Sequence, residues 1–231
     1  MNTHLLKTTL IILLCSTLSF TAWANGAANT GPSDGTSAPP TSAASVSQVL
    51  CAGSTINLKG PVDASNANYK RYQWYKLDSN GNKQLVKDST DNSYTEVSDG
   101  AGYYTYQLVI TNTNDCSSDI SDPFKVYVLP TLTPTITAAG NVTAVCEKGA
   151  SSTTLTANVT NTNFTYNYQW TRNGTDISGA TGNTYTVTEQ TAGDITFGVK
   201  VSYSLNSTCT QTATQTINVI ALPTKPVIAA G

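Results

Sequence analysis

The sequence carries one set of landmarks twice, in the same order, and this duplication is the strongest constraint on the fold. Trp74, in "YQW", recurs 96 residues later as Trp170, and an Asn-Gly pair follows each tryptophan. Other landmarks recur 91 to 95 residues apart: Cys51 and Cys146, Cys116 and Cys209, Gly102 and Gly193, and the tripeptide "LPT" at Leu129 and Leu222. A repeat of about 90 residues has the size of a domain. The sequence therefore predicts two tandem domains of one kind, residues 46–130 and 131–223.

Each half has a hydrophobic period of two, which is typical of half-buried strands. The clearest case is "DITFGVKVSY", where Ile195, Phe197 and Val199 alternate with polar or small residues. Asn80-Gly81 and Asn173-Gly174 are tight-hairpin pairs, because both residue types tolerate positive φ. No stretch sustains a helical period, so the chain is predicted to be all-β. Many short strands around one central tryptophan per unit indicate an antiparallel sandwich.

The order of these motifs resembles the immunoglobulin-like (Ig-like) family. Trp74 matches the tryptophan of strand C, and Ala101-Gly102-x-Tyr104 matches the corner that leads into strand F; the second unit has Ile195 in place of the corner tyrosine. More specifically, "CAG", "YQW", "AGYYTYQLVITN" and a late "DC" are similar to bacterial Ig-like modules of secreted and cell-surface proteins, Bacteroidetes type. The resemblance covers residues 46–223. It implies two tandem immunoglobulin-like antiparallel β-sandwiches that act in adhesion, display or spacing.

Aromatic residues divide into predicted core and predicted contact positions. The core set, which recurs at strand positions that face inward, is Trp74, Trp170, Tyr104, Tyr106 and Phe197. A recurring central tryptophan favours packing over sugar stacking. Tyr75 and Tyr103 point away from their buried neighbours and are therefore the predicted ligand contacts. The second unit has Thr171 and Asp194 at these places, so this feature is not repeated.

Four cysteines are disulfide candidates: Cys51, Cys116, Cys146 and Cys209. Pairing within each unit closes loops of about 65 residues and stabilises by about 3 to 4 kcal/mol on the chain-entropy estimate. These positions, however, fall at opposite ends of a sandwich, about 20 Å apart, whereas bridged Cα atoms lie about 5.5 Å apart. The alternatives are that the segments bend, that the thiols stay free, or that a bridge crosses from Cys51 to Cys209. No Cys-x-x-Cys pair indicates a metal site.

The two ends of the sequence differ from the repeats. Residues 1–24 have the form of a signal peptide: Lys7, an apolar run from Leu10 to Phe20, and Ala22-Trp23-Ala24 at the cleavage site. Export to the cell surface or medium is expected, without membrane insertion after cleavage. Residues 25–45 are rich in Gly, Pro, Ser and Ala, which predicts a disordered leader. Residues 224–231 repeat the opening of the second unit and are interpreted as the truncated start of a third repeat, so neighbouring Ig-like repeats are expected partners.

Composition argues against most catalytic functions. Signal cleavage removes His4, the only histidine, so the mature chain cannot form a Ser-His-Asp, Cys-His or imidazole zinc site. The closest acidic pairs, Asp88 with Asp91 and Asp119 with Asp122, lie in polar, turn-like segments without the apolar surroundings that a general acid and base need. A net charge of -2 without basic blocks excludes nucleic acid as a partner. We expect a non-enzyme with no cofactor and an unidentified protein or glycan ligand; the alternative is a glycan-binding accessory region of a secreted carbohydrate-active enzyme.

Overall fold

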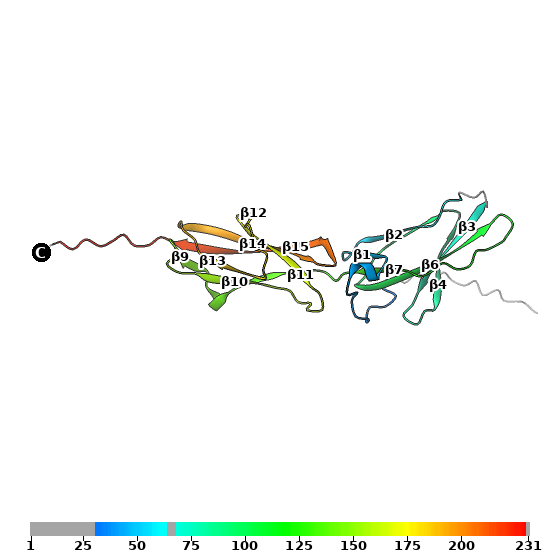
Figure 1. Cartoon of the computed structure of the whole chain (residues 1–231), viewed down its shortest axis with the longest axis horizontal. Helices are drawn as coiled ribbons and strands as arrows, with labels where there is room; N and C mark the ends of the chain where they lie inside the picture. Colours follow the sequence, from blue (N-terminus) through cyan, green and yellow to red (C-terminus); the bar gives the residue numbers. More distant parts are fainter. Residues whose placement is uncertain (1–30, 64–67, 230–231) are drawn as a thin grey trace, which may run out of the picture.

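The computed structural model of the chain describes residues 31–63 and 68–229. Within these residues nearly all regular structure is β, which confirms the predicted fold class. Figure 1 shows two β-sandwiches, one after the other along the long axis of the molecule. The predicted signal peptide, residues 1–24, lies outside the described residues. No helix in the described part of the chain is long and apolar enough to cross a membrane.

The N-terminal sandwich contains the first seven strands. They are β1 (Gln48–Leu50), β2 (Thr55–Lys59), β3 (Tyr69–Leu77), β4 (Lys83–Ser89), β5 (Ser93–Val97), β6 (Gly102–Asn112) and β7 (Phe124–Val128), after a 3-10 turn η1 (Ala43–Ser45). One sheet has the order β1-β7-β6-β3-β4, and the other consists of β2 and β5. Strand β1 runs parallel to β7, whereas the other pairs are antiparallel.

The C-terminal sandwich repeats this plan with one strand more in its smaller sheet. Its strands are β8 (Thr135–Ala138), β9 (Ala144–Cys146), β10 (Thr153–Asn158), β11 (Tyr166–Arg172), β12 (Thr175–Asp176), β13 (Thr184–Val187), β14 (Gly193–Tyr203) and β15 (Asn206–Ile220), with η2 (Ala139–Asn141) between β8 and β9. The larger sheet has the order β12-β11-β14-β15-β9, and the smaller β13-β10-β8. Strand β8 has no described counterpart in the N-terminal sandwich.

The alternating strands bury one face each, and the five predicted core aromatics lie in the two cores. In β14, Ile195, Phe197 and Val199 are buried while Thr196 and Lys200 are exposed. Trp170 is fully buried and donates its indole N–H to the carbonyl of Gly182 at 2.9 Å. Tyr104 donates its hydroxyl to the carbonyl of Gly100 at 2.9 Å, which fixes the corner before β6. Each such aromatic contributes about 2 to 3 kcal/mol by burial.

The second Asn-Gly pair forms the tight turn that the sequence predicts. Asn173 and Gly174 both have positive φ, 48° and 82°, and they join β11 directly to β12. Two consecutive positive φ values match the right-handed twist of a hairpin, which is why this pair suits a two-residue loop. In the first unit the loop is longer, and Asp78 organises it by accepting hydrogen bonds from the backbone N–H groups of Asn80 and Asn82.

Candidate functional site

A disulfide joins the two sandwiches. Cys51, directly after β1, is bonded to Cys209 in β15, with Cα atoms 5.3 Å apart and a sequence separation of 158. The expectation of pairing within each unit is therefore wrong, and the crossing alternative is correct. Cys116 and Cys146 are free. The physical reason is the one that opposed same-unit pairing: the two cysteines of a sandwich lie at its opposite ends, and the ends that meet belong to different sandwiches.

A row of aromatic rings fills the junction beside the disulfide. Tyr103 and Tyr127 belong to the N-terminal sandwich, and their ring centroids lie 4.8 Å apart in an edge-to-face arrangement. Tyr127 continues to Phe164 at 6.4 Å, and Phe164 to Tyr203 at 5.1 Å. Aromatic pairs of this kind contribute about 0.5 to 1.5 kcal/mol each beyond their burial. The row therefore ties β6 and β7 to the loop before β11 and to the end of β14.

Side-chain hydrogen bonds to backbone carbonyls also cross the same junction. The hydroxyl of Tyr203 donates to the carbonyl of Pro130 at 2.9 Å. The side-chain amide of Asn206 donates to the carbonyl of Val49 at 2.8 Å. Burial raises the pKa of Tyr203 well above its ordinary value, so its phenol keeps the donated proton at any physiological pH. The two bonds fix the orientation of one sandwich on the other, because each has a defined direction.

The core of the C-terminal sandwich extends into the junction without a break. Tyr127, Leu129 and Leu132 belong to the same buried cluster as Trp170, and Val49 packs against it. The chain segment between β7 and β8 is therefore part of a packed interior. Its leucines are no more exposed than core residues, at 0% and 8%. Such an interface differs from the solvated linker that permits domains to move independently.

The N-terminal segment corrects a second expectation. The sequence predicts a disordered leader over residues 25–45, but in its described part, from residue 31, Asp34 and Tyr103 exchange two backbone hydrogen bonds of 3.1 and 2.8 Å. The backbone N–H of Thr105 donates to Ser33 Oγ at 3.0 Å, and the hydroxyl of Tyr103 donates to the carbonyl of Ala38 at 3.0 Å. The segment thus pairs with β6 beyond the point where β3 ends. Low apolar content did not prevent order, because backbone groups at an exposed strand edge supplied the partners.

Asp34 holds the turn of this segment. Its carboxylate accepts hydrogen bonds from the backbone N–H groups of Thr36 and Ser37, at 2.8 and 3.1 Å, and from both of their hydroxyls. The hydroxyl of Ser37 and the backbone N–H of Thr36 are the main causes that hold the pKa of Asp34 far below its usual range. The carboxylate therefore stays ionised, and the turn keeps its acceptor, in mildly acidic surroundings.

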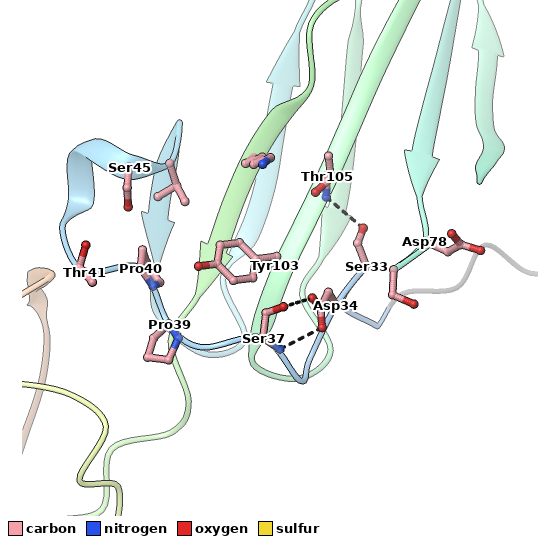
Figure 2. A pocket seen from close by; sticks show the side chains of 13 residues that line it. Ser33, Asp34, Ser37, Pro39, Pro40, Thr41, Ser45, Asp78, Tyr103 and Thr105 are labelled. Carbon is pink, nitrogen blue, oxygen red and sulfur yellow. Dashed lines mark hydrogen bonds between the residues drawn. The ribbon is translucent and has the colours of Figure 1, made fainter. Parts of the chain in front are cut away.

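A surface pocket of about 510 Å³ lies where this segment meets the sheet. Figure 2 shows the ring of Tyr103 in the middle of the pocket, with Pro39 and Pro40 on one side and Asp34 and Ser37 on the other. Of the two predicted contact residues, Tyr103 lines this pocket and is half-buried. Tyr75 is also half-buried but does not line it. Tyr75 lies opposite Gln107 on β6, four positions from Tyr103 and hence about 13 Å along the strand.

Two matched glycines test the contact between the segment and β6. A Cβ on Gly102 would lie 2.5 Å from the carbonyl oxygen of Asp34 and 2.9 Å from Cα of Gly35, whereas a Cβ on Gly193 would meet nothing within 4 Å. Both glycines have nearly the same positive φ, 137° and 136°, so alanine strains both backbones alike. We expect Gly102→Ala, and not Gly193→Ala, to displace the segment and to speed amide hydrogen exchange at Asp34 by about tenfold or more. Unchanged exchange at Asp34 in Gly102→Ala would contradict the described contact.

The comparisons with known proteins find similar structures at low sequence identity. No protein-family model matches the sequence, and no curated protein does. Among solved structures, the fibronectin(III)-like modules of Clostridium thermocellum CbhA align over 80% of this chain and 96% of their own, with 15% identity and a TM-score of 0.46. The N-terminal four Ig domains of Dscam1 isoform 6.9 align over 74% of this chain, with 13% identity and a TM-score of 0.33. The chain spans 42% of that Dscam1 fragment.

Proposed function

We propose that this chain is a non-catalytic, exported Ig-like repeat protein that holds its two ends at a fixed distance, in adhesion, display or spacing at the cell surface or in the medium. The observation that carries the proposal is the junction, where a disulfide, two directional hydrogen bonds and a row of aromatic rings act on one interface. Domains joined by a solvated linker move relative to each other. A protein that only tethered a ligand would gain nothing from fastening its domains in this way.

Export is part of the proposal. The form of residues 1–24 supports it, and so does a disulfide between distant positions, since such bonds persist in oxidising surroundings. The resemblance to bacterial Ig-like modules of the Bacteroidetes type adds the expectation of neighbouring repeats, with unit limits at residues 46–130 and 131–223. The ends and loops of such a rod are the surfaces on which ligands are normally presented.

The alternative, a glycan-binding accessory region of a carbohydrate-active enzyme, makes a different demand on the surface. Sugar stacking needs exposed aromatic faces in a row. Tyr75 is half-buried, and Tyr103 is engaged by the N-terminal segment through its hydroxyl and by Tyr127 through its ring. The two tyrosines do not form a platform. The spacer function therefore has the better support.

Affinity electrophoresis on common polysaccharides separates the two functions. We expect no retardation of the full chain in gels that contain soluble polysaccharide, because Tyr75 and Tyr103 do not form an aromatic platform. The Tyr75→Ala variant should migrate like the parent protein. Strong retardation of the parent that is lost in Tyr75→Ala would overturn the spacer proposal and establish the glycan-binding one.

A further inference from the structure

One edge of the N-terminal sandwich is open. Among the described residues, β2 pairs with β5 alone, whereas its counterpart β10 pairs with both β13 and β8. The backbone N–H of Gly60 donates to the carbonyl of Asn92, and the backbone N–H of Ser98 donates to the carbonyl of Ser54. The backbone polar groups at the even-numbered positions of β2 therefore point toward β5. The N–H and C=O groups of Thr55, Asn57 and Lys59 consequently point to the other edge. An unpaired edge of this kind is a template for another strand.

The sequence explains why the described residues before η1 do not cover this edge. In the C-terminal sandwich the covering strand β8 directly precedes η2, so the corresponding position in the N-terminal sandwich is the stretch before η1. That stretch contains Pro39 and Pro40, which lack backbone N–H groups and do not suit a ladder. Residues 33–38 instead bind at Tyr103 and Thr105 on the other sheet. In the part of the chain that the structure describes, the place of a first strand is therefore open.

An apolar groove of about 470 Å³ runs along this open edge. It is lined by Leu58 on β2 and Gly60 directly after it, by Trp74 and Leu108 on the opposite sheet, and by Phe124 at the start of β7. Phe124 is 41% exposed although it begins a core strand. The indole N–H of Trp74 is buried without a hydrogen-bond partner. Unfilled apolar space beside unpaired backbone groups is the arrangement that accepts an added strand, with main-chain bonds for affinity and a pocket for one side chain.

The C-terminal sandwich shows what fills the equivalent groove. Leu58 lies opposite Tyr94 and Leu155 opposite Tyr185, and each tyrosine packs on the central tryptophan of its sandwich, so the two leucines occupy equivalent positions. Ile136 of β8 lies opposite Ala157, two positions after Leu155, and packs against the core. The position equivalent to Ala157 is Gly60. An isoleucine is therefore the side chain expected over Gly60.

A segment with the required sequence is unpartnered at the other end of the described chain. Pro226-Val227-Ile228 repeats Pro134-Thr135-Ile136, with proline and isoleucine at matching places. Val227 and Ile228 are 92% and 97% exposed, and residues 221–229 belong to no strand. Six residues separate Ile220, the end of β15, from Val227, and six likewise separate β7 from β8. The segment thus has the reach, as well as the sequence, of a first strand.

The two free cysteines point to the same partner independently. In the N-terminal sandwich, Val128 pairs with Leu50 on one side and with Gly102 on the other. In the C-terminal sandwich, Val219 pairs with Val145 and with Gly193 in the same way. Leu50 and Val145 are therefore equivalent, and Cys146 occupies the position of Cys51.

Cys116 likewise occupies the position of Cys209. Thr111 and Ser202 lie nine residues after the two equivalent glycines, and their partners are Ser117 and Thr210, the residues that follow the two cysteines. The bonded pair Cys51–Cys209 therefore has an unbonded counterpart, Cys146 and Cys116. These two thiols lie at opposite ends of one molecule, because β6 leads away from the junction toward Cys116 and β15 leads away from it toward Cys146.

We propose that copies of this chain assemble head to tail, with residues 225–229 of one copy paired antiparallel to β2 of the next copy and with Cys146 of the first bonded to Cys116 of the second. The strand pairing and the disulfide call for the same direction of approach. A strand antiparallel to β2 enters at the end of the sandwich where β6 finishes, and Cys116 lies at that end. The contact joins two different surfaces, so each copy at an end keeps a free strand or a free edge to which a further copy adds. Ile228 occupies the groove over Gly60.

The covalent step is a thiol–disulfide exchange with an external disulfide. The Cys146 and Cys116 thiols together lose two protons and two electrons, an S–S bond forms between the copies, and the oxidant, a low-molecular-weight disulfide such as oxidised glutathione, is reduced to two thiols. Strand pairing does not depend on this step. It places the two sulfurs together, and the bond then fixes the assembly.

The full chain in oxidised glutathione tests the covalent part. We expect a ladder of dimers, trimers and larger species on non-reducing gels, and peptide mapping should recover Cys116 linked to Cys146. Cys116→Ser and Cys146→Ser should each abolish the ladder. A mixture of the two variants should give a dimer and nothing larger, because each variant contributes its one remaining thiol to the bond. Symmetric links between two Cys116 or two Cys146 residues, or a bond within one chain, would overturn the proposal.

The strand is tested separately in the variant Cys116→Ser, Cys146→Ser, which keeps Cys51–Cys209. We expect the weight-average mass from sedimentation to rise with protein concentration. Ile228→Asp should weaken this association about a hundredfold or more, since it buries an unpaired carboxylate. Val227→Asp is the matched control, because alternation turns that side chain to solvent. A monomer at all concentrations, or an equal loss in both variants, would overturn the proposal while leaving the spacer function intact.

Discussion

Replacing both bonded cysteines, Cys51→Ala with Cys209→Ala, is expected to lower the free energy of unfolding by about 5 kcal/mol, summed over the unfolding of both sandwiches. The bond spans 158 residues of sequence, and the entropy that a cross-link removes from the unfolded chain grows with the length of the loop. Because the loop includes most of both sandwiches, neither can unfold fully free of the constraint. The loss should therefore affect both unfolding transitions.

The chain supplies its own matched control for this experiment. Cys116→Ala with Cys146→Ala removes the same number of thiols from equivalent positions, but these thiols are free. That variant should stay within about 0.5 kcal/mol of the parent in the monomeric state. Urea unfolding followed by circular dichroism and tryptophan fluorescence measures both. Equal stabilities of the two double variants would contradict the bridge between Cys51 and Cys209.

Truncation of the second central tryptophan is the other change with a large expected effect. Trp170→Ala should lower the free energy of unfolding of the C-terminal sandwich by about 3 to 5 kcal/mol, since the indole is fully buried and a cavity would remain. The substitution also leaves the carbonyl of Gly182 without its indole donor. Because Tyr127 and Leu129 share this core, the junction should loosen as well.

A milder pair of substitutions separates packing from hydrogen bonding. Trp170→Phe loses the bond to Gly182, whereas Trp74→Phe removes an indole N–H that has no partner. We expect Trp170→Phe to be the more destabilising by about 1 kcal/mol, the net worth of one buried hydrogen bond. Thermal unfolding of the two variants beside the parent measures the difference. A larger loss in Trp74→Phe would show that the indole of Trp170 is held by packing alone.

The local alternation of apolar and polar residues was sufficient to predict the strands, the turns and the core. In β14 the side chains alternate between core and solvent, so the pattern of Ile195, Phe197 and Val199 is visible in the sequence itself. Lys76 shows the limit of this reasoning. It lies in β3 at an inward position, where its ammonium is 2.6 Å from Glu96 and 4.7 Å from the ring centroid of Tyr104. Hydrophobicity alone would place a lysine on the surface. The partner that permits its burial, Glu96, is 20 residues away in sequence, so the local pattern does not reveal it.

The sequence left the bridge from Cys51 to Cys209 as one alternative among several, because the choice depends on how two folded bodies meet. The spacing of the cysteines showed that each unit has one at either end, and the length of a strand opposed pairing within a unit. The contacts of Tyr127 with Phe164 and of Phe164 with Tyr203 lie in the same junction as the bonded cysteines, and no sequence period encodes them. The order of residues 31–45 escaped prediction for a related reason, since its partners are backbone groups.

Single-molecule energy transfer between dyes attached to Cys116 and Cys146 tests most directly whether the two sandwiches form one rigid body. These free thiols lie at the two ends of the molecule, and labelling them leaves Cys51–Cys209 in place. We predict one narrow distribution of distances in the oxidised protein and a broader one after the bridge is reduced. A broad distribution while the bridge is intact would contradict the account.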